Sequence, residues 1–324
     1  PELHDAEEAI AVLQDFDVDD QGNLVPPHPM WRMWGREGTL LTVNGQQTPN
    51  FSIPEQGLLR FRVLNASPSR IYRLALDDHP LHLMALDGMT LAELTQVDEL
   101  LLSPGQRAEV VIRGDRPPGT YALKTLPYDR GITTLMNDMM GGSGMGRGHM
   151  HRHMQSLQQI GNEAQTLVFM EYGDRAGSPA SLPSLSRIAD ASATFLPAPD
   201  TTREFIFDHG MDLQTGAAFL INGKGFDHNR IDVTVPLNHV EDWRLVNNAG
   251  MDHPFHLHVH PFQIISRNGQ PEPAAVWRDT VMVKAYETVI IRILFKEYPG
   301  KTVYHCHILD HEDQGMMGIL NVTG

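Results

Sequence analysis

Residues 288–294 have the sequence Thr288-Val289-Ile290-Ile291-Arg292-Ile293-Leu294, a short apolar run rich in β-branched side chains. Residues 58–64 form a similar run in the first half of the chain. Short runs of this kind predict β-strands. Turn-forming dipeptides separate them at short intervals: Asn44-Gly45, Pro104-Gly105, Asn222-Gly223, Asn268-Gly269 and Pro299-Gly300. Because stretches with the 3.6-residue period of a helix are scarce, the sequence predicts an antiparallel all-β sandwich or barrel.

The chain also contains an internal repeat. The Asn-Gly turn at Asn44 recurs at Asn222, an offset of 222 − 44 = 178 residues. The His-Pro pair at His79 recurs at His253, an offset of 253 − 79 = 174 residues. Two copies of one β-domain explain these similar offsets, and the stretch between them is rich in Ser, Pro and Ala, as expected of a linker. The predicted organisation is a domain at residues 1–173, a linker at residues 174–202 and a domain at residues 203–324.

The composition excludes several classes of protein. The 324 residues, 41% hydrophobic and 20% charged, suit about two globular domains and exclude global disorder. The net charge of −15 weighs against nucleic acid and against an anionic membrane surface as partners. No apolar run reaches the roughly 18 residues that a membrane-spanning helix needs. A single Cys excludes an intrachain disulfide, a Cys-only zinc site and an iron–sulfur cluster held by this chain alone.

The 17 His and 16 Met of the chain make metal-binding side chains abundant. They concentrate in two short segments of the second domain, residues 253–260 and 305–317. Side chains alternate along a strand, so Cys306 faces one side while His305 and His307 face the other. One strand can therefore serve two metal sites. On the second side, His256 and His258 share a face and can meet His305 and His307.

On the Cys306 side, His311 and Met316 can fold back toward the sulfur, and His253 supplies a second imidazole. Two imidazoles, one thiolate and a weak axial thioether are the ligand set of a blue copper centre. Zinc is the main alternative metal. Core packing is a poorer explanation, because it would bury several unpaired imidazoles at a cost of roughly 1–3 kcal/mol each.

The two segments resemble the C-terminal copper-binding signatures of the multicopper oxidases, the family of laccases, bacterial cuprous oxidases and ascorbate oxidase. The spacing His-Cys-His, three residues, His, four residues, Met carries the resemblance. The similarity extends over the whole chain, since residues 1–173 resemble the second cupredoxin domain of a three-domain member and residues 203–324 resemble the third. The resemblance implies two cupredoxin-like Greek-key β-sandwich domains.

The resemblance implies a copper role for eight side chains. The type 1 copper would be held by His253, Cys306, His311 and axial Met316. The type 2 copper would be held by His256, and the type 3 pair by His258, His305 and His307. His260 has no role in this match and is expected to be structural. Glu312 matches a carboxylate proposed in the family to help deliver protons, and a solvated loop charge is an equal alternative.

The resemblance also implies a reaction. A reducing substrate, either a phenolic or aromatic compound or Cu(I), gives up one electron at a time at the type 1 copper. Electrons pass through Cys306 to His305 and His307, and four of them reduce dioxygen to two waters. The catalytic residues of such a laccase-like oxidase would be Cys306, His305, His307 and Glu312. Copper oxidases of this type generally work outside the cytoplasm, so a periplasmic or secreted location is expected.

The chain provides only part of what this chemistry requires. In the family the oxygen-reducing cluster takes eight histidines, and this chain supplies four. The first domain has His79 and His82 at the repeated segment but no Cys near Tyr121, so we expect it to hold no copper. We also expect an N-terminal cupredoxin domain that has been removed or exists as a separate chain. On its own the chain is expected to be impaired in oxygen reduction.

Residues 136–154 hold six Met, three His and five Gly. One interpretation is a flexible surface loop. The other is copper recruitment, because thioether and imidazole groups together favour Cu(I). Similar Met-rich segments in bacterial cuprous oxidases collect Cu(I), which favours the second interpretation.

Two other functional classes compete with the oxidase. A blue-copper electron-transfer or copper-binding module needs only the Cys306 ligand set, so the pairing of His305 and His307 around it favours an oxidase. A copper nitrite reductase also has two cupredoxin domains. Its type 1 copper lies in the N-terminal repeat, where this chain has no Cys.

Overall fold

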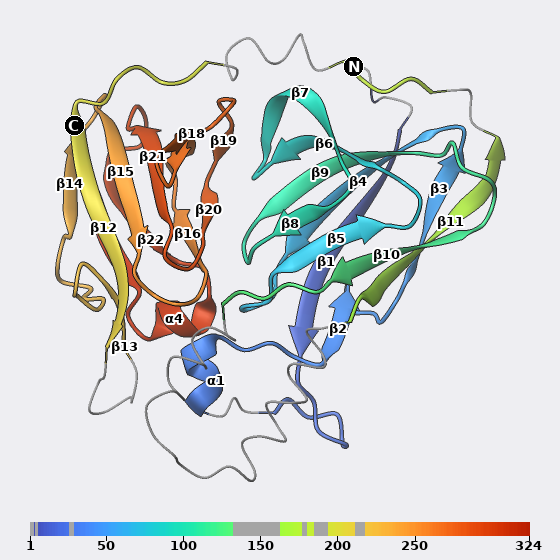
Figure 1. Cartoon of the computed structure of the whole chain (residues 1–324), viewed down its shortest axis with the longest axis horizontal. Coiled ribbons are helices and arrows are strands. Elements are labelled where there is room, and N and C mark those ends of the chain that lie inside the picture. Colours follow the sequence, from blue (N-terminus) through green and yellow to red (C-terminus); the bar gives the residue numbers. More distant parts are fainter. Residues whose placement is uncertain are drawn as a thin grey trace. The chain divides into compact units, whose positions relative to one another are not determined.

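Strands dominate the computed structural model of the chain (Figure 1). It describes residues 3, 6–25, 29–131, 163–176, 180–184, 194–210 and 218–324. Helices α1 (Pro29–Trp34) and α4 (Leu309–Asp313) are only one to two turns long. The predicted all-β class is confirmed. No helix among the described residues is long and apolar enough to cross a membrane.

The chain divides into two compact units. Unit 1 comprises Pro1–Pro26, Glu37–Ala85 and Glu93–Ser184. Unit 2 comprises Pro27–Arg36, Leu86–Ala92 and Leu185–Gly324. Two short segments from the first half of the sequence, residues 27–36 and 86–92, therefore belong to the unit that carries the metal-capable segments.

Unit 1 contains two sheets. The six-stranded sheet has the order β2 (Leu40–Val43), β1 (Glu7–Phe16), β4 (Leu58–Asn65), β9 (Arg107–Arg113), β6 (Leu81–Leu86) and β7 (Met89–Val97). The five-stranded sheet has the order β3 (Asn50–Glu55), β11 (Gln165–Ala176), β10 (Thr120–Leu126), β5 (Tyr72–Leu76) and β8 (Leu100–Leu102). The strand predicted at residues 58–64 corresponds to β4.

Unit 2 repeats this arrangement. Its larger sheet has the order β13 (Ala218–Ile221), β12 (Thr201–Gly210), β15 (Val240–Asn247), β21 (Thr288–Leu294), β17 (Phe262–Arg267) and β18 (Gln270–Pro271), with β19 (Trp277–Arg278) paired to β17. Its smaller sheet has the order β14 (Val233–Pro236), β23 (Met317–Thr323), β22 (Gly300–Cys306), β16 (His253–Leu257) and β20 (Thr280–Val283). In both units the first long strand runs parallel to its inner neighbour, β1 to β4 and β12 to β15.

Two asparagine side chains show how the sequence repeat builds equivalent turns. The residues of the Asn44-Gly45 turn have φ values of 53° and 75°, and those of the Asn222-Gly223 turn have 54° and 70°. Both positions of a two-residue hairpin turn of this kind need positive φ, which Asn and Gly tolerate best. The Asn44 side chain bonds the β1 backbone at 2.8 and 2.9 Å, and the Asn222 side chain bonds the β12 backbone at 2.9 and 2.7 Å.

The core of unit 2 lies between its two sheets. Trp243 of the larger sheet is fully buried and packs against Phe205, with ring centroids 4.4 Å apart. Tyr304 and Phe255 of the smaller sheet contact the same indole at 5.5 and 6.4 Å. The buried cluster also includes Cys306 and Met316. Two of the candidate metal ligands, Cys306 and Met316, are thus part of the hydrophobic core.

Candidate metal centre

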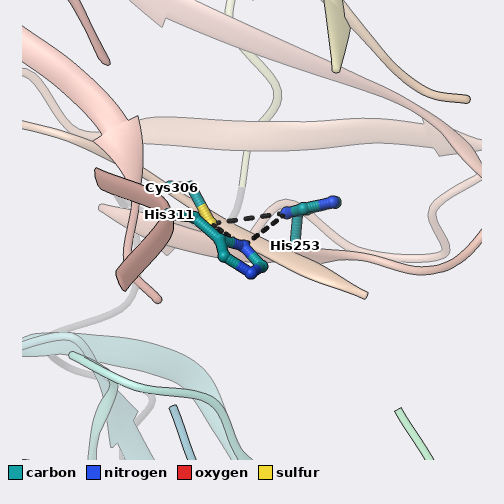
Figure 2. Close-up of side chains that lie close together, drawn as sticks. All are labelled: His253, Cys306 and His311. Atoms are coloured by element: carbon teal, nitrogen blue, oxygen red, sulfur yellow. Dashed lines mark hydrogen bonds between the residues drawn. The ribbon is translucent and has the colours of Figure 1, made fainter. Parts of the chain in front are cut away.

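Three predicted ligands from separate elements meet in the interior of unit 2 (Figure 2). Cys306 ends β22, His253 begins β16 and His311 lies in α4. The Cys306 Sγ is 3.5 Å from the His253 Nδ1 and 3.8 Å from the His311 Nδ1. The two Nδ1 atoms are 3.3 Å apart. Three donor atoms this close can share one metal ion, and all three residues are buried.

Met316 is buried beside this group by a tight return of the chain. Its N–H donates to the His311 carbonyl at 2.9 Å, and its carbonyl accepts from the Cys306 N–H at 3.0 Å. Gly315 makes the turn with a φ of 109°, and a Cβ there would lie 3.2 Å from the Gly225 Cα. The position therefore requires glycine both for its φ and for the close approach of the two backbones.

A second group lies on the other face of β22. One ligand atom from each of His256, His258 and His305 lies within 4.8 Å of the others. The Nε2 atoms of His258 and His305 are 3.0 Å apart. His307 lies next to this group, with its ring centroid 5.7 Å from that of His256 and 5.5 Å from that of His305. The structure therefore brings the predicted ligands together as two groups on opposite sides of one strand.

Hydrogen bonds to the rings select the nitrogen that each imidazole offers. The His256 Nδ1 donates to the Asp279 carbonyl at 2.8 Å and lies 3.0 Å from the Thr280 Oγ1. The His305 Nδ1 donates to the Cys306 carbonyl at 2.9 Å and lies 3.2 Å from a Glu312 carboxylate oxygen. In both rings the protonated Nδ1 leaves the Nε2 lone pair for a metal, an arrangement typical of metal-binding histidines.

Three other histidines, His260, His79 and His82, lie outside both groups. His260 is buried against the Phe295 ring, with centroids 5.1 Å apart. The His79 ring lies 2.7 Å from the Asp77 carbonyl and 2.8 Å from the Tyr172 hydroxyl, and the His82 ring lies 3.2 Å from the Val111 carbonyl. None of the three belongs to the metal-capable groups among the described residues. The Met- and His-rich residues 136–154 lie outside the described residues.

Two imidazoles of the second group have lowered pKa values, which favours the binding of a cation. Burial lowers the pKa of His258 and of His307 to about 4, and neighbouring imidazoles add to the effect. Both rings are therefore neutral near pH 7, which is the form that binds metals. Burial raises the pKa of Glu312, but its hydrogen bond with His305 and the nearby rings of His307 and His258 outweigh burial and lower it.

The donor set fits copper. The Nδ1 of His307 is buried without a hydrogen-bond partner, as expected of a nitrogen placed for a ligand other than protein. Thiolate and thioether sulfur in the first group stabilise Cu(I), and imidazole suits both oxidation states of copper. The second group contains only imidazoles, so it can hold copper with positions left open for another molecule.

Comparison with known proteins decides the family. Residues 16–139 and residues 196–324 each match a family model described as multicopper oxidase. The chain belongs to the multicopper oxidase family. A multicopper oxidase of Staphylococcus epidermidis is 26% identical over 89% of this chain and 53% of its own length. Bilirubin oxidase of Albifimbria verrucaria is 30% identical over 93% of this chain and 50% of its own length.

Solved structures of this family share the fold. The multicopper oxidase from Campylobacter jejuni, described as a metallo-oxidase, superimposes with a TM-score of 0.77 and 29% identity over 98% of this chain and 64% of its own. The McoA multicopper oxidase from Aquifex aeolicus gives a TM-score of 0.78 with 26% identity over 98% of this chain and 66% of its own. The two cupredoxin-like β-sandwich domains are thereby confirmed. The chain spans about half the length of the curated relatives it matches.

Several residues that no sequence pattern indicated orient the candidate ligand His256 through hydrogen bonds. Asp279 and Thr280 orient His256, and the Asp87 carboxylate accepts hydrogen bonds from both of their backbone N–H groups at 3.3 Å. Asp87 is 193 residues from Thr280 in the sequence. The Asp87-Gly88 dipeptide indicates a turn, but no spacing rule connects that turn to a metal ligand.

The metal-free chain is expected to lose stability as the pH falls from about 6.5 to about 4. An unfolded histidine has a pKa near 6.5, whereas the pKa of His307 in the fold is about 4. In this window the unfolded chain binds more protons, so falling pH favours unfolding. Melting temperatures across the window test this. The melting temperature of His307→Gln should fall less across the window than that of the wild type. The exposed control His209→Gln should behave like the wild type. Equal falls in all three proteins would refute the lowered pKa of His307.

Proposed function

We propose that this chain is the electron-accepting and part of the oxygen-reducing machinery of a laccase-like copper oxidase. His253, Cys306, His311 and axial Met316 would hold a type 1 copper. His256 would bind a type 2 copper, and His258, His305 and His307 would bind the type 3 pair. Bound copper would supply the one-electron redox chemistry that couples oxidation of a reducing substrate to reduction of dioxygen to water.

One observation carries the proposal: Cys306 and His305 are consecutive residues of β22 that face different metal-capable groups. A single peptide bond joins the two residues, and the His305 Nδ1–H also donates a hydrogen bond to the Cys306 carbonyl at 2.9 Å. An electron accepted beside the thiolate thus has a covalent and a hydrogen-bonded route to the second group. An electron-transfer module would need the first group alone.

The protein's own residues prepare each step. Burial of Cys306, His253 and His311 excludes water, so these residues would hold copper for electron transfer and leave dioxygen no access to it. Glu312, whose side chain is 24% exposed, lies 3.2 Å from the His305 ring with a lowered pKa. Its carboxylate is therefore ionised near neutral pH and can accept a proton from solvent and relay it toward the second group as dioxygen is reduced.

Four histidines are half of the ligands that the cluster takes in this family, and the chain spans about half of its curated relatives. We therefore propose that the other four come from a cupredoxin domain outside this sequence. For the reducing substrate we propose a phenolic or aromatic compound or Cu(I), with residues 136–154 recruiting Cu(I). A periplasmic or secreted location is part of the same proposal.

Air reoxidation distinguishes an oxidase from an electron-transfer module. The copper-loaded chain is bleached anaerobically with limiting ascorbate, and return of its visible absorption is followed after admission of air. The absorption of the wild type should return slowly, because the chain supplies half of the cluster ligands. That of the double variant His305→Gln, His307→Gln should return more slowly still, by roughly tenfold or more, because the variant loses the route to the second group. The buried control His260→Gln should match the wild type. Equal rates in all three would favour the electron-transfer module.

A further inference from the structure

The Nε2 edge of the His311 ring, on the side away from Cys306, is covered by other residues of the chain. Its Nδ1 faces Cys306 and His253, while its Nε2–H donates to the Met33 carbonyl of α1 at 3.2 Å. One face of the ring stacks on Phe219, with centroids 3.8 Å apart and an interplanar angle of 16°. His311 is fully buried. The hydrogen bond also fixes the tautomer that leaves Nδ1 for the metal.

Residues 32–36, here called the covering segment, are fastened to the same part of the chain that holds His311. The Arg36 N–H and Nε–H both donate to Asp310 Oδ2, at 3.1 and 2.9 Å. Gln314 donates from Nε2 to the Arg32 carbonyl at 3.0 Å. These contacts join α1 to α4 within unit 2 (Figure 1). Asp310 is 4% exposed, so its carboxylate depends on Arg36 for charge compensation.

The attachments differ in how easily a substitution removes them. The Met33 and Arg32 contacts use backbone carbonyls, which no side-chain substitution within the covering segment deletes. The Arg36 guanidinium is 39% exposed in its side chain and makes the charged contact to Asp310. Arg36 is therefore the side chain whose loss would loosen the segment while leaving every metal-capable residue in place.

We propose that Arg36 is a specificity-determining residue, because it holds the covering segment over His311 and keeps bulky phenols from the ring that would carry the electron. This rests on the proposed type 1 copper site. A phenol oxidised there loses one electron to the copper and its hydroxyl proton to solvent, and the electron must arrive through the imidazole edge or through the Met33 peptide. With the segment closed, small reductants such as Cu(I) are favoured over phenols.

Anaerobic bleaching of the copper-loaded chain by Cu(I) and by 2,6-dimethoxyphenol tests the proposal. Arg36→Ala should raise the phenol rate by roughly fivefold relative to the Cu(I) rate, since one charged hydrogen bond no longer holds the segment closed. Arg32→Ala is the matched control, because Arg32 bonds Gln314 through its backbone carbonyl, and it should leave the ratio unchanged. Equal changes with both reductants, or the same change in Arg32→Ala, would overturn the proposal.

Hydrogen exchange on the metal-free chain supplies a readout that does not depend on activity. The Arg36 amide should be protected in the wild type and exchange faster in Arg36→Ala. If Arg36→Ala fails to fold, Gln314→Ala removes a second attachment and should shift the reductant ratio in the same direction. No visible copper band in the wild type would refute the proposed function, whereas a normal band with an unshifted ratio would refute only the role of Arg36.

Discussion

Replacing Cys306 with Ser is expected to abolish the strong visible absorption of the copper-loaded chain while leaving the chain folded. The chain has one Cys, so no other thiolate can replace it. Serine is nearly isosteric with cysteine. Its hydroxyl would lie near the His253 Nδ1 and the His311 Nδ1, which are 3.5 and 3.8 Å from the Cys306 sulfur. A small shift of either ring brings an imidazole nitrogen within hydrogen-bond distance of the buried hydroxyl, so the cost in stability is small. The oxygen cannot give the charge transfer from sulfur to copper that colours the site.

Two measurements check this expectation. Absorption spectra of the copper-loaded variant should lack the visible band, and its melting temperature without copper should stay close to that of the wild type. Met316→Leu is the matched control, because it removes the Met316 thioether but keeps the thiolate, and it should keep a shifted band. A band of wild-type strength in Cys306→Ser would remove Cys306 from the site.

Trp243→Ala is expected to destabilise unit 2 by about 3–5 kcal/mol, the range for deletion of a large buried aromatic side chain. The indole is fully buried among Phe205, Tyr304 and Phe255, so its removal leaves a cavity between the two sheets. Its Nε1–H also donates to the buried Glu241 carboxylate at 2.8 Å. In the variant the Glu241 carboxylate would still accept a hydrogen bond from the Arg203 Nε–H, at 2.7 Å in the structure. The cavity therefore accounts for most of the lost stability.

Denaturant unfolding of the metal-free chain measures this loss. Trp243→Phe should cost less, because most of the ring volume remains. Tyr298→Ala, at a side chain that is 69% exposed, should change the free energy of unfolding by less than about 0.5 kcal/mol. A change below about 1 kcal/mol in Trp243→Ala would show that the two sheets do not depend on this ring.

Local sequence signals predicted the strands and the two sides of β22. The run at residues 288–294 coincides with β21, and the repeated Asn-Gly turns have the positive φ values that their chemistry requires. Alternation placed Cys306 and His305 on opposite faces, and the structure groups them separately with other predicted ligands. These features follow from the period of a strand and from turn chemistry, which are properties of neighbouring residues.

Long-range supporting contacts could not be predicted in the same way. The Met33 carbonyl meets His311 across 278 residues, and the Asp87 carboxylate meets the Thr280 N–H across 193. In the first case the acceptor is a backbone group, which every residue type carries, so no residue pattern marks it. The assignment of Pro27–Arg36 to unit 2 likewise depends on tertiary packing.

Copper content measured together with the absorption spectrum tests the central claim most directly, namely a complete type 1 site beside half of an oxygen-reducing cluster. Copper should be titrated into the metal-free chain while the visible and near-ultraviolet absorption is recorded. We predict a strong visible band that saturates at one copper per chain, without the near-ultraviolet shoulder of a coupled copper pair. Saturation without a visible band, or four coppers per chain with that shoulder, would contradict the account.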